Sequence, residues 1–489
     1  MNDDASLGPV ERLHPLFLIT GLGSSMRRAG GAFAALAYLA ATGKWAALLI
    51  VAPVLALSLV AGLFIYWQHF QFRVGASEIR IDHGLLKRTH RSIPFDRIQD
   101  VDITQPLLAR AFGLARVKFE TGGSAGAKEE EGILQAITLE RAQNLRALVR
   151  ARRGVAADAP TSAVAEPAPI YGMDLRRVLL AGVFNFSLAV LAGLFGISQT
   201  FGNIAGFDPL SRRFWREMLA AGSPLLDLLM AHQAIAALAG SIVLVLLGLA
   251  TGMVRTLLRD YRFRLDRSGK GLRRRRGLLT LTDVTLPIRR IQAAIIGTGP
   301  LRQAFGWFDL KLQSLARDES NKGDHIVAPL ADEAEVATIL DQLGWRPVAP
   351  DIHWGRVSPA YASTFTLALL PLTIPAAIQL LFIPPIGLAG FVAITGLIAM
   401  RWLEWRRIRY ALDGDRLLVR RGSWRRRLVI LPLTSVQSVD LTENFISRRF
   451  GTASLLIGVA GGSGFSAHGV PALPRETAHD VRTQLLLRF

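Results

Sequence analysis

Three clusters of basic residues are the groups in this sequence whose types and spacing point most directly to chemistry. Each lies in a short segment shortly after an apolar stretch. Together they comprise Lys87, Arg88, Arg91, Arg273, Arg274, Arg275, Arg276, Arg425, Arg426 and Arg427. Basic side chains close to an anionic leaflet are each attracted by about 1 kcal/mol. The clusters are therefore candidate contacts for acidic lipid headgroups. The alternatives are a solvated charged face and a signal for membrane topology.

Residues for catalysis form no recognisable motif. The sequence has no His-Glu-x-x-His, no Gly-x-Ser-x-Gly and no phosphate loop ending in Gly-Lys-Ser/Thr. The run 461–464 comes nearest to a nucleophile elbow, but Phe465 replaces the closing glycine, so a loop is expected. With zero cysteines and nine scattered histidines, no thiolate or metal chemistry is expected. We therefore expect no enzymatic activity, no catalytic residue, no cofactor and no metal.

Apolar segments are the elements that must position the basic clusters. Of the 489 residues, 51% are hydrophobic and 19% are charged, which is more apolar than is usual for a soluble protein. A membrane helix needs about 20 apolar residues. Candidate spans occur in three pairs, of which the first segment is the shortest: 30–42 with 45–67, 178–197 with 234–254, and 361–383 with 386–402.

The polar content of these segments bears on their function. Their cores contain no Asp, Glu, Lys, Arg or His, and Asn185 and Gln379 are the main polar residues. Ionisable groups inside a membrane mark ion and proton pathways. Their absence argues against an ion-coupled transporter and leaves passage of an apolar substrate open.

The charge distribution predicts an orientation in the membrane. The formal net charge is +19, and most basic residues are arginines. Arginines flank the apolar pairs mainly on the side that holds the long segments between pairs, and the positive-inside rule makes that side cytoplasmic. The acidic start, Met1 to Asp4, argues against a cleaved signal peptide. Nucleic acid is not expected as a partner, because apart from Trp424 the clusters lack interleaved aromatic residues.

A threefold internal repeat follows the apolar pairs. Corresponding residues recur without gaps at offsets of 193 and 145. The recurring set in the first copy is Gly84, Pro94, Gln99, Phe112 and Gly113; in the second, Gly277, Pro287, Gln292, Phe305 and Gly306; in the third, Gly422, Pro432, Gln437, Phe450 and Gly451.

Each recurring residue has a structural interpretation. The first glycine suits a turn with positive φ between two strands, and the proline suits a strand end. The phenylalanine falls on one face of a short helix, where we expect it to be buried, and the second glycine suits the helix end. Alternating apolar residues then predict a half-buried strand, as in Ala115, Val117 and Phe119. An amphipathic helix closes each copy.

The apolar pairs followed by Gly…Ile/Leu-Pro-x-x-x-Ile-Gln…Phe-Gly resemble the bacterial PH-like, membrane-flanked domain family of the YdbT type. The resemblance covers nearly the whole chain in three copies. The second copy departs where Ala293-Ala294 replace Asp100-Val101, and the third has Thr434-Ser435 where the others carry Arg97 or Arg290. The family brings no general enzymatic activity. It implies a fold and a location in a bacterial cytoplasmic (inner) membrane.

We therefore predict a multi-pass α-helical membrane protein with three small PH-like β-barrel or sandwich domains, each closed by a C-terminal helix. The expected segments are an N-terminal cytoplasmic segment 1–29, a transmembrane hairpin 30–67, a PH-like domain 70–153, an Ala/Pro linker 154–172, a transmembrane pair with an interfacial loop 173–257, a second PH-like domain 260–346, a linker 347–359, a transmembrane hairpin 360–404 and a third PH-like domain 406–489.

Two classes of function fit these expectations. The leading one is a membrane-anchored scaffold or sensor whose cytoplasmic PH-like domains bind a partner protein, one another or acidic membrane lipid. Candidate partners are membrane lipid, another protein and further copies of the chain in a homo-oligomer. The alternative is a translocator of lipid or amphiphiles that confers tolerance to membrane-active compounds.

Overall fold

The protein is described here from a computed structural model. It covers residues 7–21, 25, 30–84, 89–121, 132–152, 168–186, 233–269, 271–315, 324–349, 351–459 and 468–487. Two compact units account for the chain: the first comprises residues 1–168, 172–264 and 273–285, and the second comprises residues 169–171, 265–272 and 286–489. Lys87, Arg88, the run 461–464 and most of the linker 154–172 lie outside the described residues.

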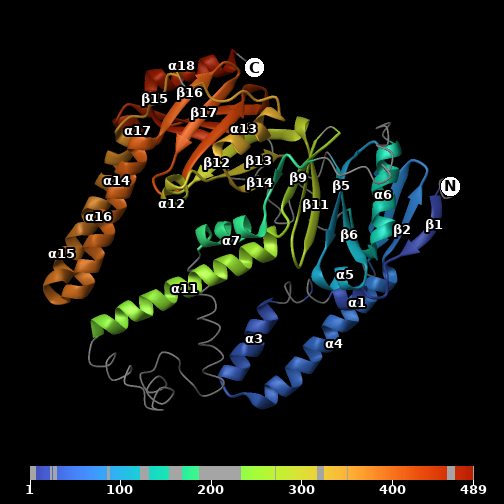
Figure 1. Ribbon diagram of the computed structural model, residues 1–489. Coiled ribbons are helices and arrows are strands. Elements are labelled where there is room, and N and C mark those ends of the chain that lie inside the picture. Colours follow the sequence, from blue (N-terminus) through green and yellow to red (C-terminus); the bar gives the residue numbers. More distant parts are fainter. Residues whose placement is uncertain are drawn as a thin grey trace. The chain divides into compact units, whose positions relative to one another are not determined.

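The elements recur in three successive sets, as the internal repeat predicts (Figure 1). The first set is β1 (Leu7–Arg12), α1 (Phe17–Thr20), α3 (Gly30–Ala41), α4 (Trp45–His69), β2 (Gln71–Gly75), β3 (Glu78–His83), β4 (Thr89–Pro94), β5 (Ile98–Gln105), α5 (Leu107–Ala111), β6 (Leu114–Thr121), β7 (Ile133–Thr138) and α6 (Leu139–Arg152).

The second set is β8 (Tyr171–Gly172), α7 (Leu175–Phe184), α11 (Gln233–Asp260), β9 (Arg264–Ser268), β10 (Gly271–Arg276), β11 (Leu281–Pro287), η2 (Ile288–Arg290), β12 (Ile291–Thr298), α12 (Pro300–Ala304), β13 (Phe308–Ser314), β14 (Asp324–Ala331) and α13 (Glu333–Asp341).

The third set is β15 (Gly355–Arg356), α14 (Ala360–Leu369), η3 (Leu370–Leu372), α15 (Thr373–Phe382), α16 (Pro384–Arg407), β16 (Arg409–Asp413), β17 (Arg416–Arg421), β18 (Arg426–Pro432), η4 (Leu433–Ser435), β19 (Val436–Thr442), α17 (Phe445–Arg449), β20 (Thr452–Val459), β21 (His468–Pro474) and α18 (Arg475–Leu486).

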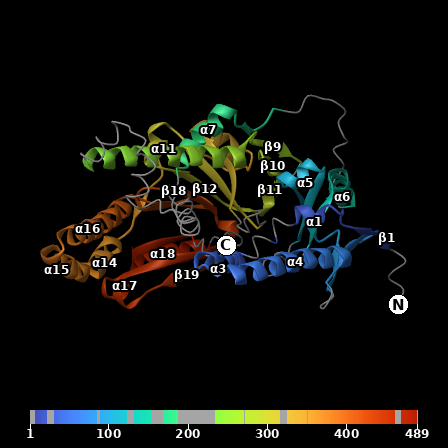
Figure 2. The ribbon, with the colours of Figure 1, turned by 90° about the horizontal axis from the view of Figure 1, so that it is seen from below.

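Four helices of the described chain are long and apolar enough to cross a membrane. They are Trp45–His69, Ile242–Asp260, Ala360–Phe382 and Gly387–Arg407. They match four of the six predicted spans, and α14 and α16 contact each other along the third pair (Figures 1 and 2). The first predicted span forms α3, whose 12 residues reach only about 18 Å. The third predicted span forms α7, and the rest of it lies outside the described residues.

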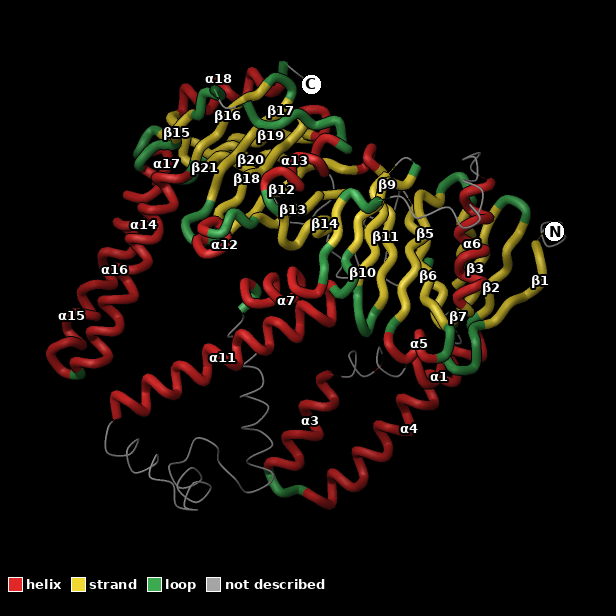
Figure 3. Tube along the Cα trace, viewed as in Figure 1, coloured by secondary structure: helices red, strands yellow, loops and turns green. Residues whose placement is uncertain are grey.

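Within the described residues, the strands form four sheets, and two of these sheets contain strands from two successive repeats (Figure 3). The orders are β1-β2-β3-β4, β7-β6-β5-β11-β10-β9-β8, β14-β13-β12-β18-β17-β16-β15 and β19-β20-β21. Strands from two successive repeats therefore share a sheet. In the second unit, β12 of the second repeat pairs with β18 of the third, with Ala294 opposite Ile430 and Thr298 opposite Arg426.

The first and third repeats each build a core between two half-sheets. In the first repeat, Ile79 and Ile93 from β3 and β4 pack in one cluster with Val117 of β6 and Leu145 of α6. In the third repeat, strands β16 to β18 and β19 to β21 enclose a cluster that α18 closes with Val481 and Leu485. The amphipathic C-terminal helices are therefore confirmed as lids on these cores.

The predicted turns and strand ends are confirmed as well. Gly84, Gly277 and Gly422 have φ angles of +101°, +118° and +99°. A Cβ atom at Gly277 would lie 1.9 Å from the carbonyl oxygen of Thr280, so this tight turn requires glycine. The three recurring prolines end β4, β11 and β18.

The expected burial of the recurring phenylalanines is wrong. Phe112, Phe305 and Phe450 expose 46%, 68% and 42% of their surface. Helical spacing defines a common face for these residues, but it does not say whether protein covers that face. The three short helices turn other apolar side chains outward too, among them Leu108, Leu301 and Ile446.

Candidate anion-binding pocket

A pocket of about 600 Å³ lies in the second unit, where α16 ends and the third repeat begins. The lining residues come from neighbouring strands of one sheet, β13, β12, β18, β17 and β16, and from α12, α13 and the end of α16. Seven arginines line it: Arg406, Arg407, Arg409, Arg420, Arg421, Arg426 and Arg427. Glu333, at the start of α13, is the carboxylate among the lining residues.

The hairpin of β17 and β18 concentrates charge because of its register. Arg421 lies directly opposite Arg427 across the two strands, and Gly422 makes the turn that follows β17. Like charges placed opposite each other destabilise an antiparallel pair. An anion held between the two guanidinium groups would relieve that repulsion.

The pocket arginines use neutral partners. Arg407 donates to the carbonyl oxygen of Ser423, and Arg426 donates to the side-chain oxygen of Gln303. The guanidinium of Arg420 lies 3.9 Å from the ring centre of Trp354. Within the described residues, none of the seven arginines forms an ion pair within 4.0 Å. The seven arginines thus share a single carboxylate of the lining, Glu333.

Two pocket arginines are partly desolvated, although Arg420 is exposed and Arg409 is half-buried. Desolvation lowers the pKa of Arg420 from its ordinary value. Desolvation also lowers the pKa of Arg409, and the nearby charge of Arg356 contributes in the same direction. The Nε atom of Arg426 is buried without a hydrogen-bond partner. An anionic ligand would form charge-assisted hydrogen bonds with these partly desolvated guanidinium groups.

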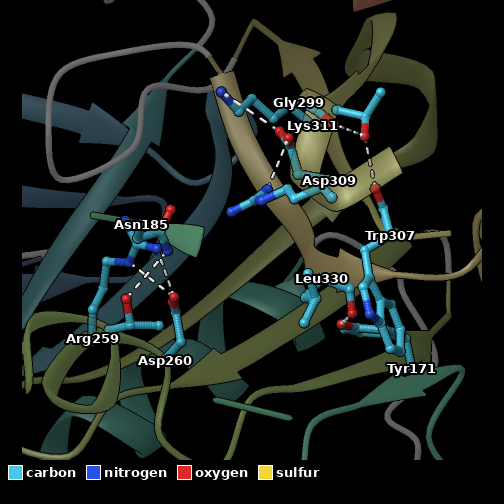
Figure 4. A network of polar contacts seen from close by, with 12 residues as sticks. Tyr171, Asn185, Arg259, Asp260, Gly299, Trp307, Asp309, Lys311 and Leu330 are labelled. Atoms are coloured by element: carbon cyan, nitrogen blue, oxygen red, sulfur yellow. Dashed lines mark hydrogen bonds and ion pairs between the residues drawn. The ribbon is translucent and has the colours of Figure 1, made fainter. Parts of the chain in front are cut away.

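At the preceding junction, in the first unit where β11 of the second repeat pairs with β5 of the first, arginines bind two aspartates. Of these arginines, Arg276 corresponds to a pocket residue, Arg421. Asp260 is fully buried and accepts from Arg276 at 3.0 Å and from Arg259 at 2.7 Å (Figure 4). Asp283 accepts from Arg273 at 2.5 Å and from Arg146 at 3.0 Å. At the offset of 145 residues, these two aspartates correspond to Trp405 and Leu428.

The pKa of Asp283 reports how tightly this network is paired. Burial by itself would raise the pKa of this carboxyl. The hydrogen bond from Arg273 and the positive charges of Arg146 and Arg273 outweigh burial, so the pKa lies below its ordinary value. The aspartate remains ionised and balances the arginines around it.

Most of the described arginines that were predicted to contact lipid headgroups are buried or half-buried in the structure. Arg274 is fully buried, and Arg273 and Arg276 bind aspartates, so in this structure none of these three presents a free cation to a headgroup. Arg275 is half-buried on β10, and Arg91 is half-buried on β4. In the third cluster, Arg425 and Arg427 are exposed, and Arg426 and Arg427 line the pocket.

Arg409, Arg420 and Arg421 of the pocket were missed by the sequence analysis. The alignment of the second and third repeats could have pointed to these arginines. It shows that arginines persist at positions 407, 409, 420 and 421 while the aspartates of the previous junction are replaced. Among the described residues, no group of three His, Asp or Glu side chains is arranged to hold a metal ion.

Comparisons with known proteins agree with this architecture. The bacterial PH domain family matches the chain three times, at residues 21–153, 222–346 and 367–488. The chain therefore belongs to the bacterial PH domain family. It is also 24% identical, over 428 residues, to the UPF0699 transmembrane protein YdbT of Bacillus subtilis (strain 168). That match covers 82% of this chain and 81% of the relative. No solved structure matches the chain.

The family and the transmembrane relative establish a membrane protein with PH-like repeats. They confirm the resemblance drawn from the repeat motif.

Proposed function

We propose that this protein is a non-enzymatic, membrane-anchored scaffold that holds an acidic lipid headgroup in the arginine-lined pocket. The observation that carries the proposal is the charge imbalance of that pocket. Seven arginines and one carboxylate line it, whereas the arginines of the preceding junction are paired with Asp260 and Asp283. Arginine donors and a phosphate form strong charge-assisted hydrogen bonds.

The position of the pocket supports a lipid as the source of the anion. Arg406 and Arg407 are the last residues of α16, and they also end the candidate span Gly387–Arg407. A site that begins where a span ends lies at the depth of the headgroups. The volume of about 600 Å³ falls within the range of small-ligand pockets.

The exposed apolar residues of the short helices also support a position of the repeats next to the lipid headgroups. Helix α17 contacts α14, which belongs to a candidate span, and it exposes Phe445, Ile446 and Phe450. Apolar side chains next to basic ones suit the boundary between headgroups and acyl chains. Arg448 and Arg449 supply the basic residues in the last turn of α17.

The orientation follows from the charge pattern. We propose that both termini and all three repeats face the cytoplasm of a bacterial inner membrane. Reporter fusions after residues 150, 345 and 489 are expected to report cytoplasm. A periplasmic signal at any one of them contradicts the orientation.

Native mass spectrometry of the full chain tests the pocket. The detergent-solubilised protein is titrated with phosphatidylglycerol or with phosphatidylcholine. The pocket variant carries Arg420→Gln and Arg427→Gln. The control variant carries Arg97→Gln and Arg152→Gln, two exposed arginines outside the pocket. We expect the pocket variant alone to lose at least tenfold in phosphatidylglycerol affinity, the equivalent of about one charge-assisted hydrogen bond.

Two further outcomes decide the proposal. Equal binding of the two lipids by the wild type, or equal loss in both variants, contradicts a headgroup site in the pocket. Competition by millimolar inorganic phosphate would identify a free anion rather than a lipid as the ligand.

A further inference from the structure

Among the edge strands of the described sheets, each of which has a paired neighbour on one side only, β4 belongs to the first repeat and β19 to the last. β4 ends the sheet β1-β2-β3-β4, and β19 begins the sheet β19-β20-β21. β4 pairs with β3, and β19 pairs with β20. The second long edge of each strand therefore offers backbone donors and acceptors to a further strand.

The equivalents of these two strands pair with each other wherever one repeat follows another. β11, the equivalent of β4, pairs with β5, the equivalent of β19. β18 and β12 form the same pairing between the second and third repeats. The register is also the same, because Leu281 faces Gln105 as Arg426 faces Thr298, at offsets of 145 and 193.

We propose that β19 of one copy pairs in antiparallel fashion with β4 of a second copy, so that the junction made twice inside each chain is repeated between chains. The occupant of each open edge is thus another molecule of this protein. The proposal does not depend on the arginine pocket, because neither strand lines it.

The internal register specifies which residues meet between copies. It places Thr89 opposite Thr442, which repeats the internal pair of Thr282 and Thr104. It also places Arg91 opposite Asp440, where the second internal junction has Val429 opposite Ile295. Threonine pairs and opposite charges on facing strands both stabilise an antiparallel ladder.

The burial of equivalent residues is consistent with a missing strand. Asp102 and Thr104 on β5 are buried in the shared sheet. Their equivalents on β19, Asp440 and Thr442, are exposed. A strand from a second copy would cover them as β11 covers β5.

Charge selects this pairing over the alternatives. Pairing of two β19 strands would bring the Asp440 side chains of two copies close together. Pairing of two β4 strands would bring basic residues of two copies together. Opposite charges meet only when β4 faces β19. Such a head-to-tail contact builds a ring or an open chain of molecules. Anchoring in one membrane also raises the effective concentration of the two edges.

Cysteine crosslinking of the full chain in its membrane tests the contact, since the sequence has no cysteine. Chains with Thr89→Cys are co-expressed with chains carrying Thr442→Cys, and the membranes are oxidised. We expect a covalent dimer that contains one chain of each kind. The positive control is a chain with both Thr104→Cys and Thr282→Cys, which stand at the equivalent internal positions.

An out-of-register control uses His90→Cys with Thr442→Cys, because neighbouring residues on a strand point to opposite faces. We expect little product from it. The proposal is overturned if the positive control crosslinks and the mixed chains do not. It is also overturned if Thr89→Cys and Thr442→Cys in one chain give only an internally closed monomer.

Charge reversal supplies a second measurement. We expect Asp440→Arg to reduce the mass of the detergent-solubilised assembly, and Arg91→Asp in the same chain to restore it. A wild-type protein that stays monomeric at all concentrations, or an Asp440→Arg variant with unchanged mass, overturns the proposal.

Discussion

Arg276 donates a hydrogen bond to the buried carboxylate of Asp260 at 3.0 Å, and 145 residues later the same two positions hold Arg421 and Trp405. The same replacement occurs at Asp283, whose counterpart is Leu428. The second junction has therefore kept Arg421, the counterpart of Arg276, and lost both aspartates. One repeat junction is neutralised from within, and the next is charged and open to a ligand.

Breaking the internal pair at Asp260 is expected to destabilise the first unit. Asp260→Asn leaves Arg276, which is largely buried, without its counter-charge. Removing one partner of a buried ion pair costs about 3–5 kcal/mol. A lower midpoint of thermal unfolding in detergent checks this. Asp96→Asn, at an exposed position, serves as the control and is expected to leave the midpoint unchanged. Equal midpoints for the two variants contradict the pairing.

Restoring an acid to the second junction is expected to abolish anion binding there. Leu428 faces Arg420 across the hairpin of β17 and β18, and its counterpart in the first unit is Asp283. Leu428→Asp supplies an internal counter-charge that competes with the ligand. We expect at least a tenfold loss of phosphatidylglycerol affinity with the fold retained. Leu428→Asn, which adds polarity without charge, isolates the charge effect. Unchanged affinity in Leu428→Asp argues against a site at these arginines.

Acid is expected to remove the stability that Asp283 provides. Its pKa is lower in the folded protein, so the unfolded chain binds the proton more readily. The contribution is therefore complete above the ordinary pKa of about 4 and is lost as the pH falls through the lower folded value. Unfolding midpoints of the wild type and of Asp283→Asn should differ most near pH 7 and converge below about pH 4. A constant difference across this range refutes the assignment.

The local elements could be predicted from the sequence because their causes are local. Gly277 needs positive φ next to the carbonyl of Thr280, and Pro287 ends a strand because it lacks an N–H group. The apolar stripe of Val481 and Leu485 likewise requires a covered helix face. Such constraints act within about ten residues, so a single repeat displays them.

The candidate pocket depends on pairings that no single repeat displays. The approach of Arg426 to Gln303 follows from the pairing of β18 with β12, across 123 residues of sequence. A cluster such as 273–276 is uniform in sequence, yet Arg274 is buried and Arg273 binds Asp283. Alternation along β10 and the position of the opposing aspartate decide these roles. Both come from tertiary structure.

The exposed phenylalanines are expected to reach lipid. Phe450 lies just after α17, which contacts α14 of a candidate span, whereas Gln484 lies on α18, which packs on the sheet of β19 to β21. Spin labels on Phe450→Cys and on Gln484→Cys, each the only cysteine of its chain, distinguish the two environments. In vesicles we expect the first label to be relaxed more by oxygen, which concentrates in acyl chains. The second should respond more to a water-soluble nickel complex.

The free energy of unfolding provides a second measurement of whether protein covers Phe450. Phe450→Ser should change the free energy of unfolding by only about 0.5 kcal/mol, as expected for an exposed position, instead of the roughly 3–5 kcal/mol of a core phenylalanine. The corresponding substitution of the buried Leu455 on β20, Leu455→Ser, is the destabilising control. Equal accessibility of both labels to the nickel complex would show that water, and not lipid, covers Phe450. A large loss of stability in Phe450→Ser would instead show that protein covers it.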